Sequence, residues 1–542
     1  MQAGGGWAGK QRLWPGLAAG ALAVAVGLAG ALWRRTEERP RAARNVILVT
    51  VDTLRADRLG VYGHAGARTP HIDALAREGT LFLQATTPFP RTTPALASLL
   101  TGLWPHRHGS REVGAPMLER PTLAQVLGRR GYATLGVSAN GAAGPAQHLD
   151  LGFSSFVDRA ELKGDQAELV TDRALALLRE TPLHQPVLLW AHYVDPHFPY
   201  EAPADFSRAS DDGSCRGLIA DMRARRVKLA YVHNDHDGIA SRALGDCFAA
   251  YDAEIAYTDA ELGRLLDGLR RLGRLVDALV VFTSDHGENM GEDGLYYEHG
   301  PSVHDSSLRV PLIVTGGGPA GRVDRGVARL EDVVPTLLRL LGEPRAAWPD
   351  MDGVDLSRRL GGAGFLGAGP QPTGLAEGGT DLFVEAHRQV RSGRPRGFSC
   401  LNAERFSLCE KPGWDWPRLF DRASDPELRE DVSAAHRREK RRMMQARRLW
   451  PPGEARQRTA RTAFFKLVER PRWQGGYERR LYDLRADPGE TRDVGSEQPD
   501  VLERLTKELG VWTAQIARAA LHAPDGVDPE QLDGLRALGY LQ

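Results

Sequence analysis

Three continuous apolar runs along the chain each end in an acidic residue. They are Asn45–Asp52 (NVILVTVD), Pro186–Asp195 (PVLLWAHYVD) and Ala278–Asp285 (ALVVFTSD). A short apolar run without polar alternation predicts a strand that is buried on both faces, as in a parallel sheet. Segments with helical periodicity lie between the runs: Ile72–Glu78, Leu123–Arg130, Ala167–Arg179 and Phe248–Leu272. This alternation of strands and helices predicts an α/β fold with a doubly wound, mostly parallel sheet.

The residues that follow these predicted strands carry the candidate chemistry. Asp52 ends the first run, Asp195 is followed closely by His197, and Asp285 is followed by His286. In open α/β sheets, ligands bind beyond the carboxyl ends of the strands. A single Asp at a strand end is often only a helix cap. Three strands with this ending, two of them with a histidine, favour a shared site over three separate caps.

An uncharged segment, Leu13–Trp33, lies between basic residues near the N-terminus. It is roughly 20 residues long, which as a helix matches the hydrocarbon core of a membrane. The segment predicts a transmembrane anchor at 13–33 after a short tail, 1–12. A signal peptide cleaved near Ala29–Ala31 is the alternative. Basic residues after the segment favour a cytoplasmic C-terminal side, but long domains cross membranes regardless of such charges. We expect an extracytoplasmic, periplasmic catalytic domain.

The rest of the chain divides by composition. A charged linker, 34–44, precedes the α/β domain at 45–360, and a glycine-rich linker, 361–379, follows it. The C-terminal part, 380–542, contains a repeat, in which 406–432 resembles 465–494. Each copy shows two strand-like segments joined by a turn, so we expect a smaller antiparallel β subdomain there.

Composition and cysteine content exclude some classes of function. Lys+Arg and Asp+Glu both number 70, so no net charge attracts nucleic acid, and none is expected as a partner. Apolar residues make up 42% of the chain, which is typical of a globular protein. The four cysteines have no CxxC spacing, which argues against a zinc knuckle. Bridges Cys215–Cys247 and Cys400–Cys409, or four buried thiols, both fit the sequence.

Two stretches suggest metal-assisted ester chemistry. Asp285 and His286, together with Asp52, supply oxygen and nitrogen ligands that suit Zn²⁺ or Mn²⁺. His299 lies on the loop that follows and can reach a neighbouring metal. Thr92 precedes Pro94 and an apolar helical run, so its hydroxyl is expected at a helix N-terminus, where anions are favoured. A metal can activate such a hydroxyl as a nucleophile, although Thr92 as a simple helix cap also fits.

Seven motifs, in this order, resemble the sulfatase branch of the alkaline-phosphatase superfamily. They are Val51–Asp57, Thr69–Ala76, Pro94–Gly102, Asp195–Pro199, Ser284–Glu288, Leu308–Val314 and Leu481–Pro488. The resemblance extends from Asn45 to Val494 and implies an alkaline-phosphatase-like fold and an ester hydrolase or transferase.

Four departures from the family pattern concern the site, and three of them remove a cationic group. Family sulfatases carry Cys or Ser, converted to formylglycine, where this chain has Thr92. The arginine of the same motif is replaced by Leu96, and the family's Lys-x-His element becomes Val137–Asn140. The lysine after the Asp-His-Gly element is also missing. A second metal in place of these cations is a consistent explanation.

The loop from Asp285 to Gly300 also resembles that of the phosphoethanolamine transferases, which use a threonine nucleophile and two zinc ions. By this resemblance the first metal is surrounded by Asp52, Thr92, Asp285 and His286. His197 and His299 serve the second metal or the substrate phosphate, and Asn140 either donates to a non-bridging oxygen or is structural. Asp195 is a weaker candidate.

Together, the motifs and the resemblance predict a metal-dependent hydrolase or phosphotransferase. We expect it to act on a phosphate ester through a covalent Thr92 intermediate, with Thr92, His197 and Asn140 as catalytic residues. The cofactors are expected to be two divalent ions, zinc first, with manganese or calcium as alternatives. A sulfatase acting on sulfate esters and a non-catalytic, membrane-tethered binding protein are the competing interpretations.

Overall fold

A computed structural model gives the structure of the protein. It describes residues 44–207, 213–225, 242–292, 295–300, 302–361, 373–380, 383–388, 396–402, 406–410, 418–421, 432–438, 440, 456–472 and 476–519. The chain forms two compact units, 1–44 and 45–542. The predicted anchor at 13–33 belongs to the first unit and lies outside the described residues. Within the ranges given above, no helix is both long enough and apolar enough to cross a membrane.

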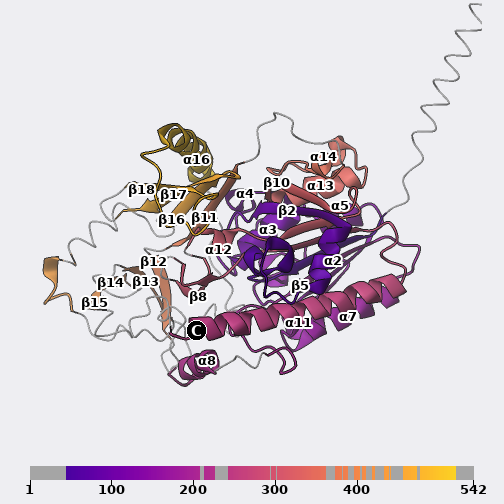
Figure 1. The fold of residues 1–542 in the computed structure, drawn as a ribbon, viewed down its shortest axis with the longest axis horizontal. Coiled ribbons are helices and arrows are strands. Elements are labelled where there is room, and N and C mark those ends of the chain that lie inside the picture. Colours follow the sequence, from indigo (N-terminus) through magenta and orange to yellow (C-terminus); the bar gives the residue numbers. More distant parts are fainter. Residues whose placement is uncertain are drawn as a thin grey trace, which may run out of the picture. The chain divides into compact units, whose positions relative to one another are not determined.

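An eight-stranded sheet is central to the second unit (Figure 1). In spatial order its strands are β10 (Arg322–Arg329), β2 (Gly79–Thr86), β9 (Leu312–Thr315), β6 (Leu279–Ser284), β1 (Val46–Val51), β5 (Val187–Tyr193), β3 (Ala133–Ser138) and β4 (Ser155–Val157). Strand β9 runs antiparallel to both neighbours, and the other pairs are parallel. The mostly parallel sheet is therefore confirmed. The three apolar runs are its adjacent strands β6, β1 and β5, so their carboxyl ends meet at one edge.

Helices cover both faces of this sheet. Figure 1 shows α7 (Ala167–Glu180) and α11 (Leu244–Arg271) side by side. Together with α2 (Pro70–Glu78) they contribute to one apolar core, and α3 (Thr92–Thr101) and α5 (Leu123–Gly128) contribute to another. Successive residues of β1 alternate between the two cores, as the period of a strand requires. Each fully buried aliphatic side chain contributes about 1.5–3 kcal/mol. The doubly wound arrangement is thus as predicted.

The remaining elements of the α/β part are short. They are α4 (Pro105–His108), α6 (Arg159–Leu162), α8 (Ser214–Arg225), α12 (Asp305–Leu308), α13 (Val333–Leu340), α14 (Ser357–Leu360), β7 (Asn289–Met290) and β8 (Tyr296–Glu298), and the described residues also form five 3-10 turns. Cys215 in α8 and Cys247 in α11 form a disulfide, so this one of the two suggested bridges is confirmed.

Two four-stranded antiparallel sheets follow. One consists of β11 (Gly374–Thr380), β16 (Arg456–Arg461), β17 (Phe465–Pro471) and β18 (Tyr477–Asp483). The other consists of β12 (Phe383–Arg388), β13 (Arg396–Asn402), β14 (Phe406–Glu410) and β15 (Arg418–Asp421). The sequence repeat appears as two hairpins of equal register, since Phe406 lies opposite Asp421 and Phe465 opposite Asp483. Cys400 lies opposite Cys409 in neighbouring strands.

The end of the expected glycine-rich linker differs from the prediction. Residues 362–372 lie outside the described residues, but Gly374–Thr380 forms strand β11 rather than a loop. Its backbone pairs with β16. A side chain at Gly374 would also approach Thr86, because a Cβ built there lies 2.9 Å from the threonine hydroxyl oxygen. Here glycine serves a close approach between two sheets, and the composition alone does not distinguish this use from a flexible linker.

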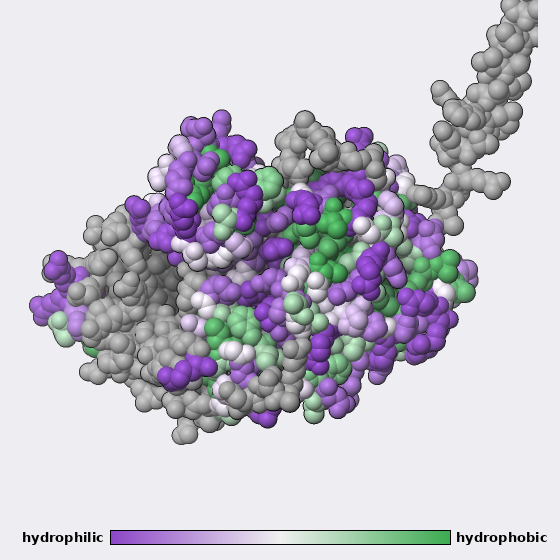
Figure 2. Space-filling model, viewed as in Figure 1, coloured by the Kyte–Doolittle hydropathy of each residue, from purple (hydrophilic) through white to green (hydrophobic). Residues whose placement is uncertain are grey.

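Helix α16 (Pro499–Ala519) packs on the first of these sheets. Its apolar residues Leu505, Leu509, Trp512 and Ile516 recur every three or four positions and share a core with Leu467 and Leu481 of the sheet. Figure 2 shows hydrophilic side chains over the outer side of α16. The helix is therefore amphipathic, with one stripe buried against the strands.

A cluster of ion pairs joins the loop after β8 to this sheet. Asp305, the first residue of α12, receives hydrogen bonds from Arg461 (Nη2 to Oδ2, 2.7 Å) and Lys466 (Nζ to Oδ1, 2.9 Å). Lys466 also contacts Glu490 (2.9 Å) and is fully buried. Burial alone raises the pKa of Asp305, but the charges of Arg461 and Lys466 outweigh it and hold the pKa well below its usual range.

Replacing Asp305 by asparagine is expected to destabilise the fold by about 3 kcal/mol at pH 7, because Arg461 loses its carboxylate partner and Lys466 keeps only Glu490 in a buried site. Since the folded-state pKa of Asp305 is lowered, its stabilisation is present above the unfolded pKa of about 3.9 and is lost as the pH falls further. Denaturant unfolding of both proteins should therefore show a difference that shrinks below about pH 4. Asp350→Asn is the control, since Asp350 is 86% exposed in its pair with Arg107.

Candidate functional site

Strand geometry brings three of the candidate side chains to one face of the sheet. In β1, β5 and β6, Leu48, Trp190 and Val281 share a core with α3. Side chains two residues apart point to the same face of a strand. Asp52, His192 and Asp285 have the same parity as these core residues, so they too face α3, at whose first position Thr92 lies.

The predicted first-metal residues converge in this place. Ligand atoms of Asp52, His192 and Asp285 all lie within 4.8 Å of one another. The Nε2 atom of His286 lies 3.6 Å from Asp52 Oδ1 and 3.5 Å from Asp285 Oδ2. Thr92 Oγ1 lies 3.3 Å from the same Nε2. All five side chains are completely buried. Residues distant in the sequence therefore surround one hydroxyl group.

The donor atoms in this cluster are oriented for a cation. Asp52 Oδ1, Asp285 Oδ2 and His192 Nε2 are buried and have no hydrogen-bond partner among the described residues. His286 Nδ1 lies 3.0 Å from the carbonyl oxygen of Gly287, which can only accept, so Nδ1 carries the proton and Nε2 keeps its lone pair. Carboxylate oxygens and neutral imidazole nitrogens are the ligands that Zn²⁺ and Mn²⁺ take. The residues fit a divalent cation.

The electrostatics agree with this fit. Burial raises the pKa of Asp52 well above its usual range, and the charge of Asp285 raises it further. Burial likewise raises the pKa of Asp285 to about 6 and lowers that of His286 to about 3. Two carboxylates and a neutral imidazole thus share a buried site, and among the described residues no Lys or Arg forms an ion pair with either carboxylate. A divalent cation removes this repulsion, since it favours the ionised carboxylates.

Backbone and amide groups hold the other oxygens of the two carboxylates. Asp285 Oδ1 accepts from the backbone N–H of His286 (2.8 Å) and of Thr53 (3.3 Å). Asp52 Oδ2 accepts from Asn140 Nδ2. Asn140 is held in turn, because its Oδ1 accepts from the N–H of Ala142 (2.6 Å). Asn140 therefore positions Asp52. Its contact with a substrate oxygen stays a prediction.

His197 and His299 form a second pair of imidazoles beside the first group. The ring centroid of His299 lies 4.4 Å from that of His286 and 5.2 Å from that of His197. Within the described ranges, Asp52, His192 and Asp285 are the one group of three potential ligands this close together. The pair His197 and His299 is thus brought to the site as predicted, but without a third ligand of its own. A second metal there stays a prediction.

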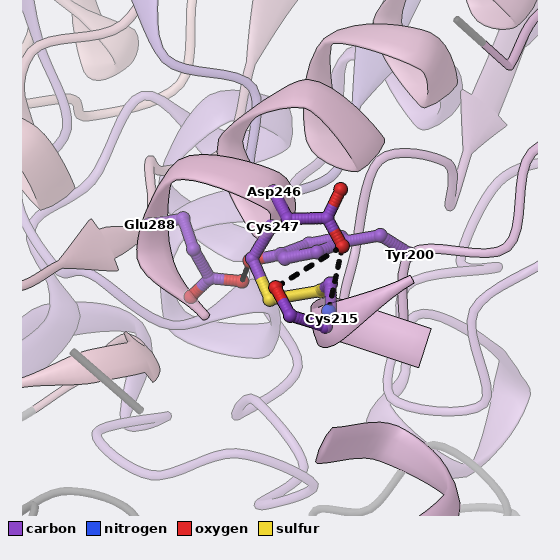
Figure 3. The surroundings of a disulfide bond; sticks show 6 residues. Tyr200, Cys215, Asp246, Cys247 and Glu288 are labelled. Carbon is purple, nitrogen blue, oxygen red and sulfur yellow. Dashed lines mark hydrogen bonds between the residues drawn. A yellow bond between two sulfur atoms is a disulfide. The ribbon is translucent and has the colours of Figure 1, made fainter. Parts of the chain in front are cut away.

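A chain of contacts links His299 to the disulfide region. Glu288 Oε1 lies 3.0 Å from His299 Nδ1, and the hydroxyl of Tyr200 donates to Glu288 Oε2 at 3.4 Å. Figure 3 shows Tyr200 and Glu288 beside the Cys215–Cys247 bridge. Glu288 is fully buried, and burial raises its pKa well above the usual range. These contacts hold the ring of His299 on its Nδ1 side.

The structure also shows the surroundings of Asp195, of His108 and of the Thr92 hydroxyl. Asp195 is paired with Glu254 of α11, and burial raises the pKa of both carboxyls. His108 contacts Ser98 (3.0 Å) and Ser110 (3.2 Å) through its two ring nitrogens, which fits a structural role. Thr92 is not the cap of its helix, because the N-cap residue of α3 is Arg91, and Thr92 Oγ1 faces His286 instead.

His192 and Glu288 are site residues that the sequence interpretation did not assign. His192 lies inside an apolar strand, where a histidine is more often part of the core. The sequence feature that could have indicated His192 is the alternation of side chains along the strand. His192 faces the side opposite to Tyr193 and the same side as Trp190. Nothing in one sequence shows which partner strands flank that side, so the signal becomes informative only when the register is known.

Comparison with known proteins agrees with this geometry. A sequence model of the sulfatase family matches residues 44–343. Human arylsulfatase A is 30% identical over 381 residues, which cover 63% of this chain and 71% of that protein. The multifunctional alkaline phosphatase superfamily protein PehA of Trinickia caryophylli is 27% identical over 478 residues, covering 71% and 90%.

A solved structure shares the fold. The structure of BT4656 in complex with D-glucosamine-2-N,6-O-disulfate has a TM-score of 0.59 and 17% identity, and the match covers 88% of this chain and 99% of that one. The family match spans more than half of the chain and includes β1, α3, β5, β6 and the residues gathered around Thr92. The chain therefore belongs to the sulfatase family of the alkaline-phosphatase superfamily, and it is an ester-hydrolysing enzyme.

Proposed function

We propose that this enzyme hydrolyses a phosphate ester through a covalent intermediate on Thr92, with a divalent cation, zinc first, held by Asp52, Asp285, His286 and His192. The observation that carries the proposal is the position of Thr92 Oγ1, 3.3 Å from His286 Nε2 at the N-terminus of α3. Two buried carboxylate oxygens without hydrogen-bond partners lie beside it. Threonine cannot be converted to formylglycine, so a direct hydroxyl nucleophile replaces the family's usual group.

The residues suggest a two-step reaction. When bound, the cation favours ionisation of the hydroxyl and offsets negative charge on the ester. Thr92 Oγ1 loses its proton to water and forms a bond to phosphorus, while the bond to the leaving oxygen breaks. That oxygen takes a proton from water beside the imidazoles of His197 and His299, because burial lowers the pKa of His197 to about 4 and its ring is neutral at pH 7. Water then attacks the phosphorus of phospho-Thr92, which restores the hydroxyl and releases phosphate. An acceptor hydroxyl in place of water would make the enzyme a phosphotransferase.

Sulfate esters are the second candidate substrate class. The names of relatives favour it, since arylsulfatase A is named for aryl sulfates and BT4656 was solved with a sulfated sugar as its substrate. PehA is named as multifunctional, which fits activity on more than one ester. The same attack by Thr92 applies, with sulfur in place of phosphorus and sulfate as the product.

An ester panel tests the proposal. The full-length protein, purified and loaded with zinc or manganese, is assayed with an aryl phosphate monoester, an aryl phosphate diester and an aryl sulfate. We expect turnover of at least one phosphate ester, and loss of turnover after removal of the metal with a chelator. Faster turnover of the sulfate than of either phosphate would select the sulfatase alternative. No turnover of any ester by metal-loaded protein would refute both.

The extracytoplasmic location is also a proposal. A disulfide, such as Cys215–Cys247, persists in oxidising compartments and is rare in the cytoplasm. The expected anchor at 13–33 would then hold the enzyme at a membrane. Protease added to cells whose outer permeability barrier is opened should degrade it, whereas protection until the cells are lysed would place it in the cytoplasm.

A further inference from the structure

The site lacks the arginine that the family motif places one helical turn after the nucleophile. That position is Leu96, which is 0% exposed and packs in the apolar core between α3 and the sheet. A negatively charged ester bound at Thr92 therefore meets no cation from this turn of α3. Phosphate and sulfate esters carry charge on their terminal oxygens throughout the reaction, so a compensating cation is expected elsewhere.

Arg91 lies where such a cation is needed. It is the N-cap residue of α3 and directly precedes Thr92. Its guanidinium packs against the backbone of Gly300, the residue after His299, because a Cβ built on Gly300 would lie 2.4 Å from Nε and 2.6 Å from both Cζ and Nη2. After burial, the positive charge of Arg91 is among the influences that lower the pKa of His286. The guanidinium thus lies close to Thr92, His286 and His299.

The guanidinium also has unused hydrogen-bonding capacity. Its Nε is buried and has no hydrogen-bond partner among the described residues. By contrast, the buried Arg329 and Arg461 are paired with Asp332 and Asp305. Arg91 as a whole is half-buried, but removing its Nε–H from water without a hydrogen-bond partner is unfavourable. A cation kept in this state beside a nucleophile is expected to have a ligand as its partner.

Gly300 makes this arrangement possible. The residue has φ of +112°, a conformation that favours glycine, and its missing side chain leaves the space that the guanidinium occupies. The loop of β8 that positions His299 therefore positions Arg91 as well. Both the nucleophile helix and the histidine loop contribute to one anion-binding place.

We propose that Arg91 is an anion-binding residue, whose guanidinium takes two terminal oxygens of the ester bound at Thr92 and thereby selects phosphate or sulfate monoesters over diesters. The inference rests on the proposed role of Thr92. A guanidinium binds two oxygens at once through parallel N–H groups. A monoester offers three terminal oxygens, so one remains for the His286 side of the site. A diester offers only two terminal oxygens, and its second ester group occupies a position where the guanidinium would bind an oxygen.

The test compares Arg91→Gln and Arg91→Lys with the wild type, and with Arg77→Gln as a control for loss of one exposed charge. Arg91→Gln is expected to lower kcat/KM for the monoester by about 10- to 100-fold, and to weaken inhibition by inorganic phosphate to a similar extent. Turnover of the diester should change much less. Arg91→Lys should be intermediate, because it keeps the charge and loses the fork.

Thermal unfolding separates an anion-binding role from a structural one. Arg91 is half-buried and its Nε has no hydrogen-bond partner among the described residues, so Arg91→Gln should leave the melting temperature close to or above that of the wild type. A lower melting temperature, with equal losses for monoester and diester, would assign Arg91 a structural role instead. Unchanged monoester kinetics and unchanged phosphate inhibition would also overturn the proposal.

A separate readout does not depend on turnover. Inorganic phosphate is expected to raise the melting temperature of the metal-loaded wild type, and to do so much less for Arg91→Gln. If the wild type turned over no ester, the role of Thr92 would fail, whereas the phosphate shift would still decide for or against Arg91. Equal shifts in the two proteins would refute the anion-binding role even in an active enzyme.

Discussion

Replacing Thr92 by alanine is expected to reduce kcat by about a thousandfold or more, as removal of a covalent nucleophile does in other hydrolases. The Thr92 side chain is completely buried and its Oγ1 lies 3.3 Å from His286 Nε2, so the variant removes the one atom that the proposal bonds to the ester. Thr92→Ser keeps the hydroxyl and should retain measurable turnover. The measurement is steady-state turnover of the ester that the wild type hydrolyses fastest.

A matched control and a direct test accompany this variant. Thr101→Ala removes a buried hydroxyl from the last residue of the same helix, where Oγ1 donates to the carbonyl of Ala97, and should leave kcat nearly unchanged. Acid-quenched wild type should show a peptide containing Thr92 with the mass of an added phosphoryl or sulfuryl group. Thr92→Ala with wild-type turnover would remove the covalent step from the proposed mechanism.

Replacing Asp285 by asparagine is expected to lower the affinity for the divalent cation by more than 100-fold. Mutating a residue that only supports a metal ligand typically lowers the metal affinity by about 10- to 100-fold, and the loss of a ligand should lower it further. Asp285 Oδ2 lies among the ligand atoms of Asp52 and His192, and its other oxygen is already held by two backbone N–H groups. Metal content per chain after dialysis against a weak chelator is the measurement. Asp267→Asn, at an exposed ion pair, is the control.

The same variant has an opposite expected effect on the metal-free protein. Burial raises the pKa of Asp285 to about 6, so at pH 7 its ionised form destabilises the folded state, and this cost shrinks as the pH falls from about 6 to the unfolded pKa of about 3.9. Metal-free Asp285→Asn should therefore melt at or above the temperature of the metal-free wild type at pH 7. Full metal content in Asp285→Asn would show that this residue is not a ligand.

His192→Gln distinguishes the cluster found in the structure from the one expected from the sequence. If His192 Nε2 is a ligand, metal affinity falls while Thr92 and its neighbours stay in place. If His192 is only a buried core residue, metal content is unchanged and stability alone decreases.

Several features could be predicted from local patterns because their causes are local. The continuous apolar runs identified β1, β5 and β6, and the helical periodicity identified α2, α5, α7 and α11 within a few residues of their ends. The repeat predicted two hairpins, which share a register although their sequences differ at most positions. The strand β11 was not predicted, because its Gly374 reflects a close contact with Thr86, which is distant in the sequence.

The sequence predicted which residues form the candidate site, but it did not predict how they are arranged. Asp52, Thr92, Asp285 and His286 were expected together and lie together. The order of strands in the sheet explains this result, since β6, β1 and β5 are neighbours whose carboxyl ends coincide. Their order follows from the packing of the whole domain, and no single run contains it.

By itself, then, the sequence determined which segments become strands and helices. It also determined which aspartates, histidines and threonine lie at the ends of these segments. Both depend on periodicity and on neighbours along the chain. Only the tertiary structure decided that His192 faces Asp52 and Asp285, that Leu96 is core while Arg91 fits beside Gly300, and that Asn140 holds a carboxylate. Register and helix placement set these contacts, and both arise from packing between residues far apart in the chain.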